Sequence, residues 1–393
     1  YATEDLDDYP GILAEGRYHV VVGNPPYIKP KDKELNELYR ELYKEVCSGK
    51  YALSVPFAKR LFDLAKRPET DGRGSGHVGQ ITANSFMTRE FGRKLIENYF
   101  AEEIDLTRVI DTSGAYIPGH GTPTVILTGR RTPKFGRSGT IRVVMRVRGE
   151  PGAPVDPELG KVWQEIKRHY NAESFDGEWV TVADLPRQQL ASFPWSLSGG
   201  GAVELTRFLR VSGQVLSGLA MRLGVLGMTN ADDIMLAPRR AWNRKVSALE
   251  LNRRIVVGDN LRDWACHDGD WVFFPYTQDF TLVPLKMGGA YEKWLWPSRT
   301  VLGHRATFSK KTYFKEGRPW YEWHQLTRDH NAHPWAISYA FVATHNNFVL
   351  LRGDEVFKQS APVIKLPEGA TEDDHLRLLG VLNSSTACFW LKQ

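Results

Sequence analysis

An apolar run that ends in a rigid polar loop constrains the fold of this chain more than any other feature. Residues 18–23 read Tyr-His-Val-Val-Val-Gly, a short run typical of a buried strand. Asn24-Pro25-Pro26-Tyr27 follows directly. Because the prolines fix φ and lack backbone donors, the Asn24 side-chain oxygen and the Pro25 carbonyl are available as acceptors. A planar ring can lie against Tyr27, so the loop suits gripping an amino group on a flat heterocycle.

Strand-like and helix-like segments alternate through the first third of the chain. The expected strands are residues 19–23, 77–83, 104–110 and 122–128, and the expected helices are residues 31–46, 52–67 and 88–100. Strands separated by helical stretches are typical of an α/β fold with a parallel sheet. Residues 1–135 are therefore predicted to form the first domain.

The character of the sequence changes after residue 130. Residues 136–200 are rich in loop signals and are predicted to be a connecting region that ends in the Ser-Gly-Gly-Gly linker of residues 198–201. Residues 201–393 alternate strands, Trp-rich loops and Pro turns, which predicts a second, mixed α/β domain.

Composition sets limits on the class of protein. A net charge of +5 permits nucleic-acid binding without arguing strongly for it. The three cysteines are far apart and form no disulfide or metal spacing, which fits a reducing cytoplasm. No apolar run approaches 18 residues and the acidic start is no signal peptide, so no membrane association is expected. Because the first residue is Tyr1 and not Met, we expect a piece of a longer protein.

A basic, aromatic stretch in the second half is the strongest candidate for nucleic-acid contact. Lysine and arginine can contact phosphates, aromatic rings can stack on bases, and asparagine can pair with adenine. The candidate residues are Lys310, Lys311, Arg318, Trp320, Tyr321, His324, Arg328, His345, Asn346 and Asn347. The alternative for any one of them is ordinary packing or a solvated surface position.

Other chemistries find less support in the sequence. His324, His330 and His333 lack the close ligand pairs and flanking cysteines of a zinc site, so no metal is expected. No Gly-x-Ser-x-Gly elbow predicts a serine nucleophile. The acidic pairs at residues 232–233 and 373–374 are interpreted as helix caps, where carboxylates suit the helix dipole.

The Asn-Pro-Pro-Tyr loop resembles the catalytic motif of S-adenosylmethionine-dependent amino methyltransferases, in particular the adenine-N6 DNA methyltransferases. The resemblance implies that Asn24 and Pro25 accept the two N6 hydrogens of a flipped adenine, that Tyr27 stacks on the base, and that Pro26 holds the loop's shape. It also implies S-adenosylmethionine as the methyl donor and double-stranded DNA as the substrate.

Five further motifs narrow the resemblance to the BREX-type adenine methyltransferases, the PglX-like family. The motifs are residues 116–124, 320–326, 341–347, 360–365 and 382–390. Membership implies a methyltransferase core with a Rossmann-like sheet, a following target-recognition domain, and work beside other phage-defence proteins in bacteria.

Two family features are missing from the pattern. The glycine-rich loop that binds the methyl donor should precede the catalytic strand, and residues 72–76 do not replace it because they come before a strand. Cofactor-binding residues therefore remain unassigned, and Val20–Val22 is expected to form a bare apolar edge. The second aromatic that stacks on the flipped base is also missing, with Tyr116 as a weak candidate.

Three functions remain open at this point. The first is adenine methylation of DNA. The second is the same chemistry on protein or RNA, although such enzymes are usually compact and would not need the second domain. The third is a binding module that recognises DNA or a partner protein without catalysis.

Overall fold

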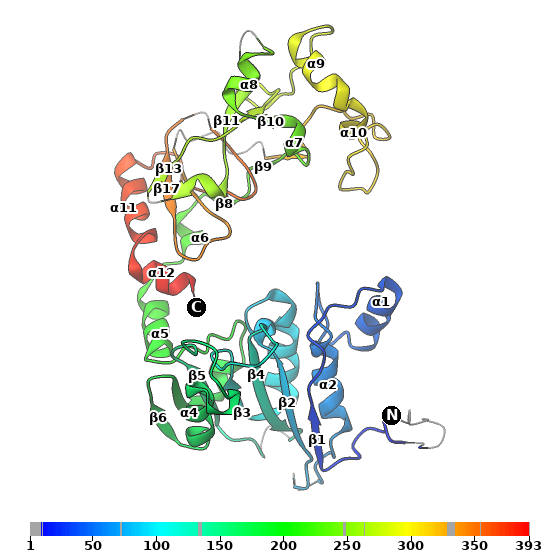
Figure 1. Cartoon of the computed structure of the whole chain (residues 1–393), viewed down its shortest axis with the longest axis vertical. Helices are drawn as coiled ribbons and strands as arrows, with labels where there is room; N and C mark the ends of the chain where they lie inside the picture. Colours follow the sequence, from blue (N-terminus) through cyan, green and yellow to red (C-terminus); the bar gives the residue numbers. More distant parts are fainter. Residues whose placement is uncertain are drawn as a thin grey trace. The chain divides into compact units, whose positions relative to one another are not determined.

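A computed structural model describes residues 9, 11–70, 73–132, 136–246, 249–262, 264–327, 335–353 and 355–392. The chain divides into two compact units, Tyr1–Leu209 and Arg210–Gln393. Each is a mixed α/β structure (Figure 1).

A seven-stranded sheet forms the centre of the first unit, with strand order β1-β2-β4-β3-β5-β7-β6. The strands are β1 (Val20–Gly23), β2 (His77–Ala83), β3 (Asp105–Asp111), β4 (Thr124–Arg130), β5 (Thr140–Arg146), β6 (Ser174–Asp176) and β7 (Val180–Pro186). β1 pairs with β2 and β3 pairs with β5 in parallel, whereas β4 and β7 run against their neighbours. Most strands therefore point the same way, as expected for an α/β fold.

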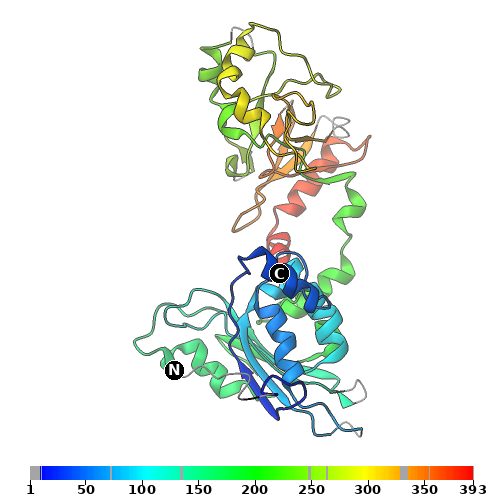
Figure 2. The same cartoon turned by 90° about the vertical axis from the view of Figure 1, so that its right-hand side faces the viewer.

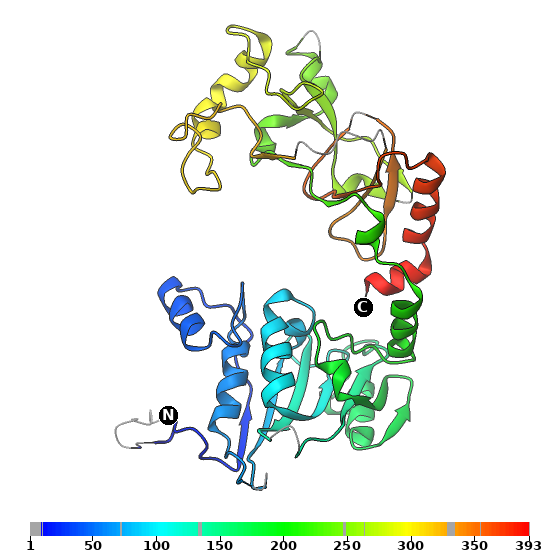
Figure 3. The same cartoon turned by 180° about the vertical axis from the view of Figure 1, so that it is seen from behind.

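Helices cover the two faces of this sheet unequally. α2 (Ser54–Leu64) and the π-helix η3 (Leu95–Phe100) pack on one face, where the main core contains Val21, Val78, Val109 and Val143. α4 (Lys161–His169) packs on the opposite face over Ile110 and Val144. Figure 2 shows α2 and α4 on opposite sides of the sheet, and Figure 3 shows α2 in front of it.

The face that α4 leaves open includes β1, which is the edge strand. Val20 and Val22 are 63% and 78% exposed, although Val21 between them is buried. α1 (Lys33–Leu42), capped by the Asp32 carboxylate on Leu35 N at 2.8 Å, contains no buried residue. The expected bare apolar edge is thus present, and its two exposed valines, Val20 and Val22, lie on the same face of the sheet.

Residues 136–200 differ from the expected connecting region. They contribute β5, α4, β6 and β7, so they complete the sheet rather than link two domains. Asp105, 1% exposed, accepts bonds from Arg187 at 2.6 Å and Arg130 at 3.0 Å, and this ties the end of β7 to β3 and β4. The boundary lies instead after Leu209, within α5 (Ala202–Ser212).

The expected helix at residues 88–100 is also different. The short turns η1 (Asn84–Met87) and η2 (Glu90–Gly92) come first, and only from residue 93 is the chain a helix, which runs through η3 into α3 (Ala101–Glu103). A Cβ on Gly92 would lie 1.9 Å from Phe86 O, so the two turns pack directly on one another.

The described residues of the second unit form two four-stranded sheets, ordered β10-β14-β11-β18 and β17-β16-β19-β8, and two short strand pairs. Its strands are β8 (Arg222–Gly224), β9 (Gly227–Met228), β10 (Leu236–Ala237), β11 (Asn252–Val256), β12 (Leu261–Arg262), β13 (Ala265–Cys266), β14 (Trp271–Phe273), β15 (Gln325–Leu326), β16 (Ala336–Tyr339), β17 (Phe348–Leu351), β18 (Val356–Phe357) and β19 (Val363–Lys365). Its helices are α6 (Leu216–Leu219), α7 (Asp232–Met235), α8 (Arg239–Asn243), α9 (Ala290–Leu295), α10 (Arg299–Gly303), α11 (Glu372–Leu382) and α12 (Ser385–Leu391). The acidic pairs at 232–233 and 373–374 do lie in first helical turns.

Candidate active site

The Asn-Pro-Pro-Tyr loop begins where β1 ends. Asn24 is exposed and Pro25 is buried, so the Asn24 amide reaches solvent from a fixed base. The loop is tied to the start of α2 because Leu53 N donates to Ile28 O at 2.8 Å. The prolines and this backbone bond restrict the loop without using the Asn24 oxygen.

Three loops meet at the edge of the sheet where β1, β2 and β3 end. Because these strands run the same way, the loops that start at Asn24, Asn84 and Thr112 leave from one edge. Asn84 N donates to Pro123 O at 3.0 Å, which joins the second loop to the third. Ligands of α/β sheets usually bind at this carboxyl edge.

A hydrogen bond within the loop sets the orientation of the Asn24 amide. The Tyr27 hydroxyl donates to Asn24 Oδ1 at 2.7 Å. Partial burial raises the pKa of Tyr27, so its hydroxyl stays protonated as a donor. A carbonyl oxygen has two lone pairs, and the second remains available to an incoming amine.

His120 is the neighbour of Tyr27 that sequence reasoning missed. Their ring centroids are 5.2 Å apart with the planes tilted by 58°. His120 lies between Gly119, with φ at +65°, and Gly121, and a Cβ on either glycine would meet nothing within 4 Å. Tyr116, the candidate named from the sequence, is 37% exposed and forms no ring contact with Tyr27 in the described residues. The glycines around His120 were the available signal.

The predicted DNA-binding residues of the second unit lie in two stretches of the sequence, residues 310–328 and residues 345–347. Lys310 and Lys311 are exposed, with Lys310 at a φ of +62° in a turn. Arg318 is half-buried and bonded to Glu322. Trp320 and Tyr321 are half-buried and touch each other edge to face. Arg328 lies outside the described residues.

Several of the remaining predicted residues are committed to packing. His324 is 8% exposed beside Phe308, and burial lowers its pKa. Asn347 is 5% exposed. Asn346 Nδ2 donates to Leu382 O at 2.6 Å and Ser384 O at 3.2 Å, so it holds the junction of α11 and α12. Among residues 345–347 only His345 is exposed.

Arg305 is a buried residue that binds the backbone of the basic stretch. It is 9% exposed and donates to Leu302 O, Trp320 O and Glu322 O at 2.8–2.9 Å. Its guanidinium lies 4.3 Å from the Tyr313 ring centroid, and Arg318 lies 4.6 Å from the same ring. Burial lowers the pKa of Arg305. Its hydrogen bonds to backbone carbonyls replace the hydrogen bonds to water that the guanidinium loses on burial.

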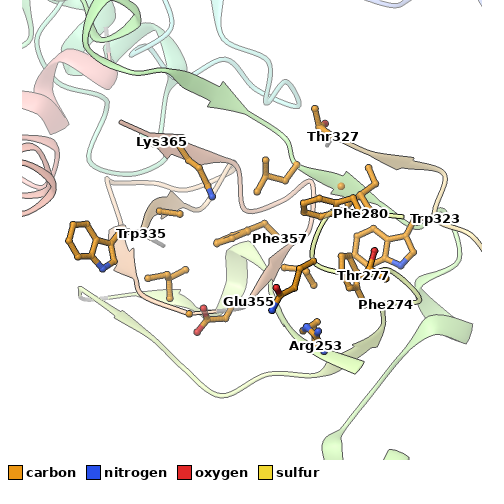
Figure 4. Close-up of a pocket in the computed structure, with 18 residues that line it drawn as sticks. Arg253, Phe274, Thr277, Phe280, Trp323, Thr327, Trp335, Glu355, Phe357 and Lys365 are labelled. Atoms are coloured by element: carbon orange, nitrogen blue, oxygen red, sulfur yellow. The ribbon is translucent and has the colours of Figure 1, made fainter. Parts of the chain in front are cut away.

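A cavity of about 530 Å³ lies in the second unit (Figure 4). Aromatic side chains such as Trp323 and Phe357 line it, together with Arg253, Glu355 and Lys365. Lys365 is 5% exposed and burial lowers its pKa. None of the described residues predicted to bind DNA lines this cavity.

Two negative observations concern the described part of the chain. No three His, Cys, Asp or Glu side chains gather there as metal ligands would. No helix there has the length and apolar character needed to cross a membrane.

Comparison with known proteins shows which proteins the chain resembles. Residues 2–117 match the family described as Eco57I restriction-modification methylase. The whole chain, all 393 residues, is 56% identical to the adenine-specific methyltransferase PglX of Streptomyces coelicolor. The predicted resemblance to the PglX-like family is confirmed. The chain spans only 32% of the length of that PglX.

Solved structures support the fold. The Type IIL restriction-modification enzyme MmeI, solved in complex with DNA, matches with a TM-score of 0.54 at 10% identity. The match covers 93% of this chain and 42% of the MmeI chain. At this identity the likeness concerns the fold alone, and it agrees with the expected mixed α/β architecture.

Proposed function

We propose that this chain supplies the base-gripping and target-recognition parts of an adenine-N6 DNA methyltransferase of a bacterial defence system. The observation that carries the proposal is the Asn24–Tyr27 loop, which leaves β1 at the carboxyl edge of the sheet with an oriented amide on its first residue. The 56% identity to an adenine-specific methyltransferase supports the choice of substrate.

The chemistry assigned to the loop follows from its groups. Asn24 Oδ1 and the Pro25 carbonyl each accept one hydrogen of the adenine amine. The two bonds stabilise the positive charge that develops on the nitrogen as it becomes tetrahedral, and they aim its lone pair. Tyr27 stacks on the flipped base, which compensates for part of the stacking that the base gives up in the duplex.

His120 is assigned to the second face of the base. A base between two rings needs about 7 Å between them, since each contact takes about 3.5 Å. The 5.2 Å separation from Tyr27 is shorter, so the glycine-flanked loop has to move outward as the base enters.

S-adenosylmethionine, as the methyl donor, would supply an electrophilic methyl group. The described loops after β1, β2 and β3 offer acceptors and an aromatic ring, but no glycine-rich turn that opens a helix. These residues alone therefore do not fit a donor pocket. We assign that pocket to further sequence that pairs with β1 and covers Val20 and Val22.

Methyl transfer to unmethylated duplex DNA, measured with the complete protein that contains these 393 residues, tests the proposal. We expect N6-methyladenine as the product and its loss in Asn24→Ala. Asn98→Ala is the matched control, because Asn98 is an exposed asparagine on η3, outside the loop. Transfer to protein or RNA in place of DNA would reject the substrate, and full activity in Asn24→Ala would reject the site.

DNA recognition is assigned to the second unit, with Lys310, Lys311 and His345 as its exposed candidate contacts. Lys310→Asn with Lys311→Ala should weaken DNA binding and lower the salt dependence of log Kd by about 2, because each lysine neutralises one phosphate. Asparagine is chosen at 310 because it tolerates positive φ. An unchanged salt dependence would remove these lysines from the interface.

A further inference from the structure

A second cavity lies beside the Asn24–Tyr27 loop. It has a volume of about 350 Å³ and shares Tyr27 as one of its walls. Two cations, Lys29 and Arg89, line it together with the side chains of Asn84, Ser85 and Thr88. Lys29 follows Tyr27 by two positions, Arg89 comes from the loop after β2, and Thr122 and Pro123 come from the loop after β3, so all three loops at the carboxyl edge line the cavity.

The two cations have no acidic partner. Within the described residues, neither Lys29 nor Arg89 forms an ion pair or a side-chain hydrogen bond. The neighbouring Arg93, by contrast, is bonded to Glu90 at 2.7 Å and Glu97 at 3.2 Å. Positive charge is therefore uncompensated where the cavity opens, and it is available to an anion.

The wall that carries Arg89 is held in place by packing. Phe86 and Met87 are buried, and Gly92 lies directly on the Phe86 backbone. Arg89 N donates to Ser85 O at 3.0 Å. The buried residues fix the turn, while Ser85, Thr88 and Arg89 between them remain half-buried or exposed. The backbone that carries these polar side chains is thus held in place.

The chemistry of these groups matches a phosphate. Lysine, arginine, hydroxyl and amide side chains are the common donors to phosphate oxygens in protein–DNA complexes. An adenine stacked on Tyr27 remains joined to its sugar and its two flanking phosphates. A flipped nucleotide turns about its backbone, so these two phosphates stay bonded to the sugar of the base at Tyr27 and lie near the cavity that Tyr27 lines.

We propose that the Lys29–Arg89 cavity binds the phosphodiester groups that flank the target adenosine. This inference rests on the proposed function, and it assigns the ligand class to residues that neither the sequence motif nor the comparisons identify. The cavity holds the backbone of the flipped nucleotide while the Asn24–Tyr27 loop holds its base.

The test is DNA binding by the complete protein, measured by fluorescence anisotropy over a series of salt concentrations. The probes are a short duplex with one unpaired adenine, which leaves the helix at little cost, and the same duplex fully paired. For Lys29→Ala/Arg89→Ala we expect affinity for the unpaired-adenine duplex to fall about tenfold or more near 0.1 M salt. The slope of log Kd against log salt should fall by about 2, and the preference over the paired duplex should shrink.

Arg17→Ala/Lys167→Ala is the matched control. It also removes two exposed positive charges from the first unit, one before β1 and one on α4, and it should leave slope and preference unchanged. Lys29→Arg should keep the wild-type slope. An unchanged slope in Lys29→Ala/Arg89→Ala, or an equal loss in the control, would overturn the inference.

Methyl transfer by the wild-type protein, measured in parallel, separates this inference from the proposed function. Transfer to adenine with an unchanged slope in Lys29→Ala/Arg89→Ala leaves the function standing and removes the phosphate site. A reduced slope without any transfer to adenine by the wild type leaves a phosphate site and rejects the function.

Discussion

The Tyr27 hydroxyl donates a 2.7 Å hydrogen bond to the Asn24 side-chain oxygen, three residues before it in the same loop. The bond fixes the direction in which the Asn24 side-chain oxygen points. The ring that carries the donating hydroxyl is also the ring assigned to stack on the base. Orientation of the acceptor and binding of the base are thus coupled through one side chain.

Removal of the hydroxyl should slow methyl transfer more than it weakens DNA binding. Tyr27→Phe keeps the stacking surface but frees the Asn24 amide to rotate. A hydrogen bond of this kind contributes about 0.5–1.5 kcal/mol, so we expect kcat to fall roughly two- to tenfold with little change in KM. Single-turnover methyl transfer by the complete protein provides the measurement. An unchanged kcat would show that the hydroxyl does not position Asn24.

Truncation of His120 tests the second stacking partner. His120→Ala should lower kcat/KM by roughly five- to a hundredfold, because stacking on a base contributes about 1–3 kcal/mol. His120→Phe should retain the activity, since a phenyl ring offers the same flat surface. Fluorescence of 2-aminopurine at the target position reports how well the flipped base is stacked. Loss of activity in both variants alike would argue for a role of the imidazole nitrogens instead.

The structure also explains which parts of the site the sequence could predict. The sequence predicts the Asn-Pro-Pro-Tyr loop and β2 because each depends on residues that are neighbours in the sequence. The signals are an apolar run, the turn residues that follow it and the alternation of apolar side chains. His120 was not, because its contact with Tyr27 bridges 93 positions and requires the sheet order β1-β2-β4.

Two other differences between the sequence pattern and the structure have the same physical origin. Residues 136–200 were expected to be a connector because their loops dominate the local pattern, yet β5 joins the sheet through parallel pairing with β3. His324 was expected to face DNA because lysines and aromatics surround it in sequence. His324 is buried beside Tyr313, whose ring Arg305 also contacts, and no local pattern indicates the interior position of Arg305.

Substitution of Val22 on the open face of β1 should reduce self-association of this chain and lower the stability of the complete protein. Val22 is 78% exposed in these 393 residues. Val22→Ser should therefore reduce self-association of this chain, measured by light scattering, because it removes apolar surface from an unpaired edge. In the complete protein, where we expect this face to be covered, it should cost about 1–2 kcal/mol of stability.

Val155→Ser is the control for this pair of measurements. Val155 is fully exposed on a loop, so its replacement should change neither self-association nor stability. Equal stability of the Val22→Ser and wild-type complete proteins would mean that the face stays open to solvent.

Asp111, at the end of β3, should make stability depend on pH. Its side chain is 6% exposed, and burial raises its pKa despite a 2.9 Å bond from Ser113 N. The folded protein then holds this proton more tightly than the unfolded chain, whose aspartates titrate near 3.9. Its contribution is most favourable at low pH and is lost as pH rises through the raised pKa. Asp111→Asn keeps an acceptor for Ser113 without a charge. In urea unfolding, the variant should gain stability over the wild type as pH rises from about 4 to 7; a gain confined to low pH would contradict the raised pKa.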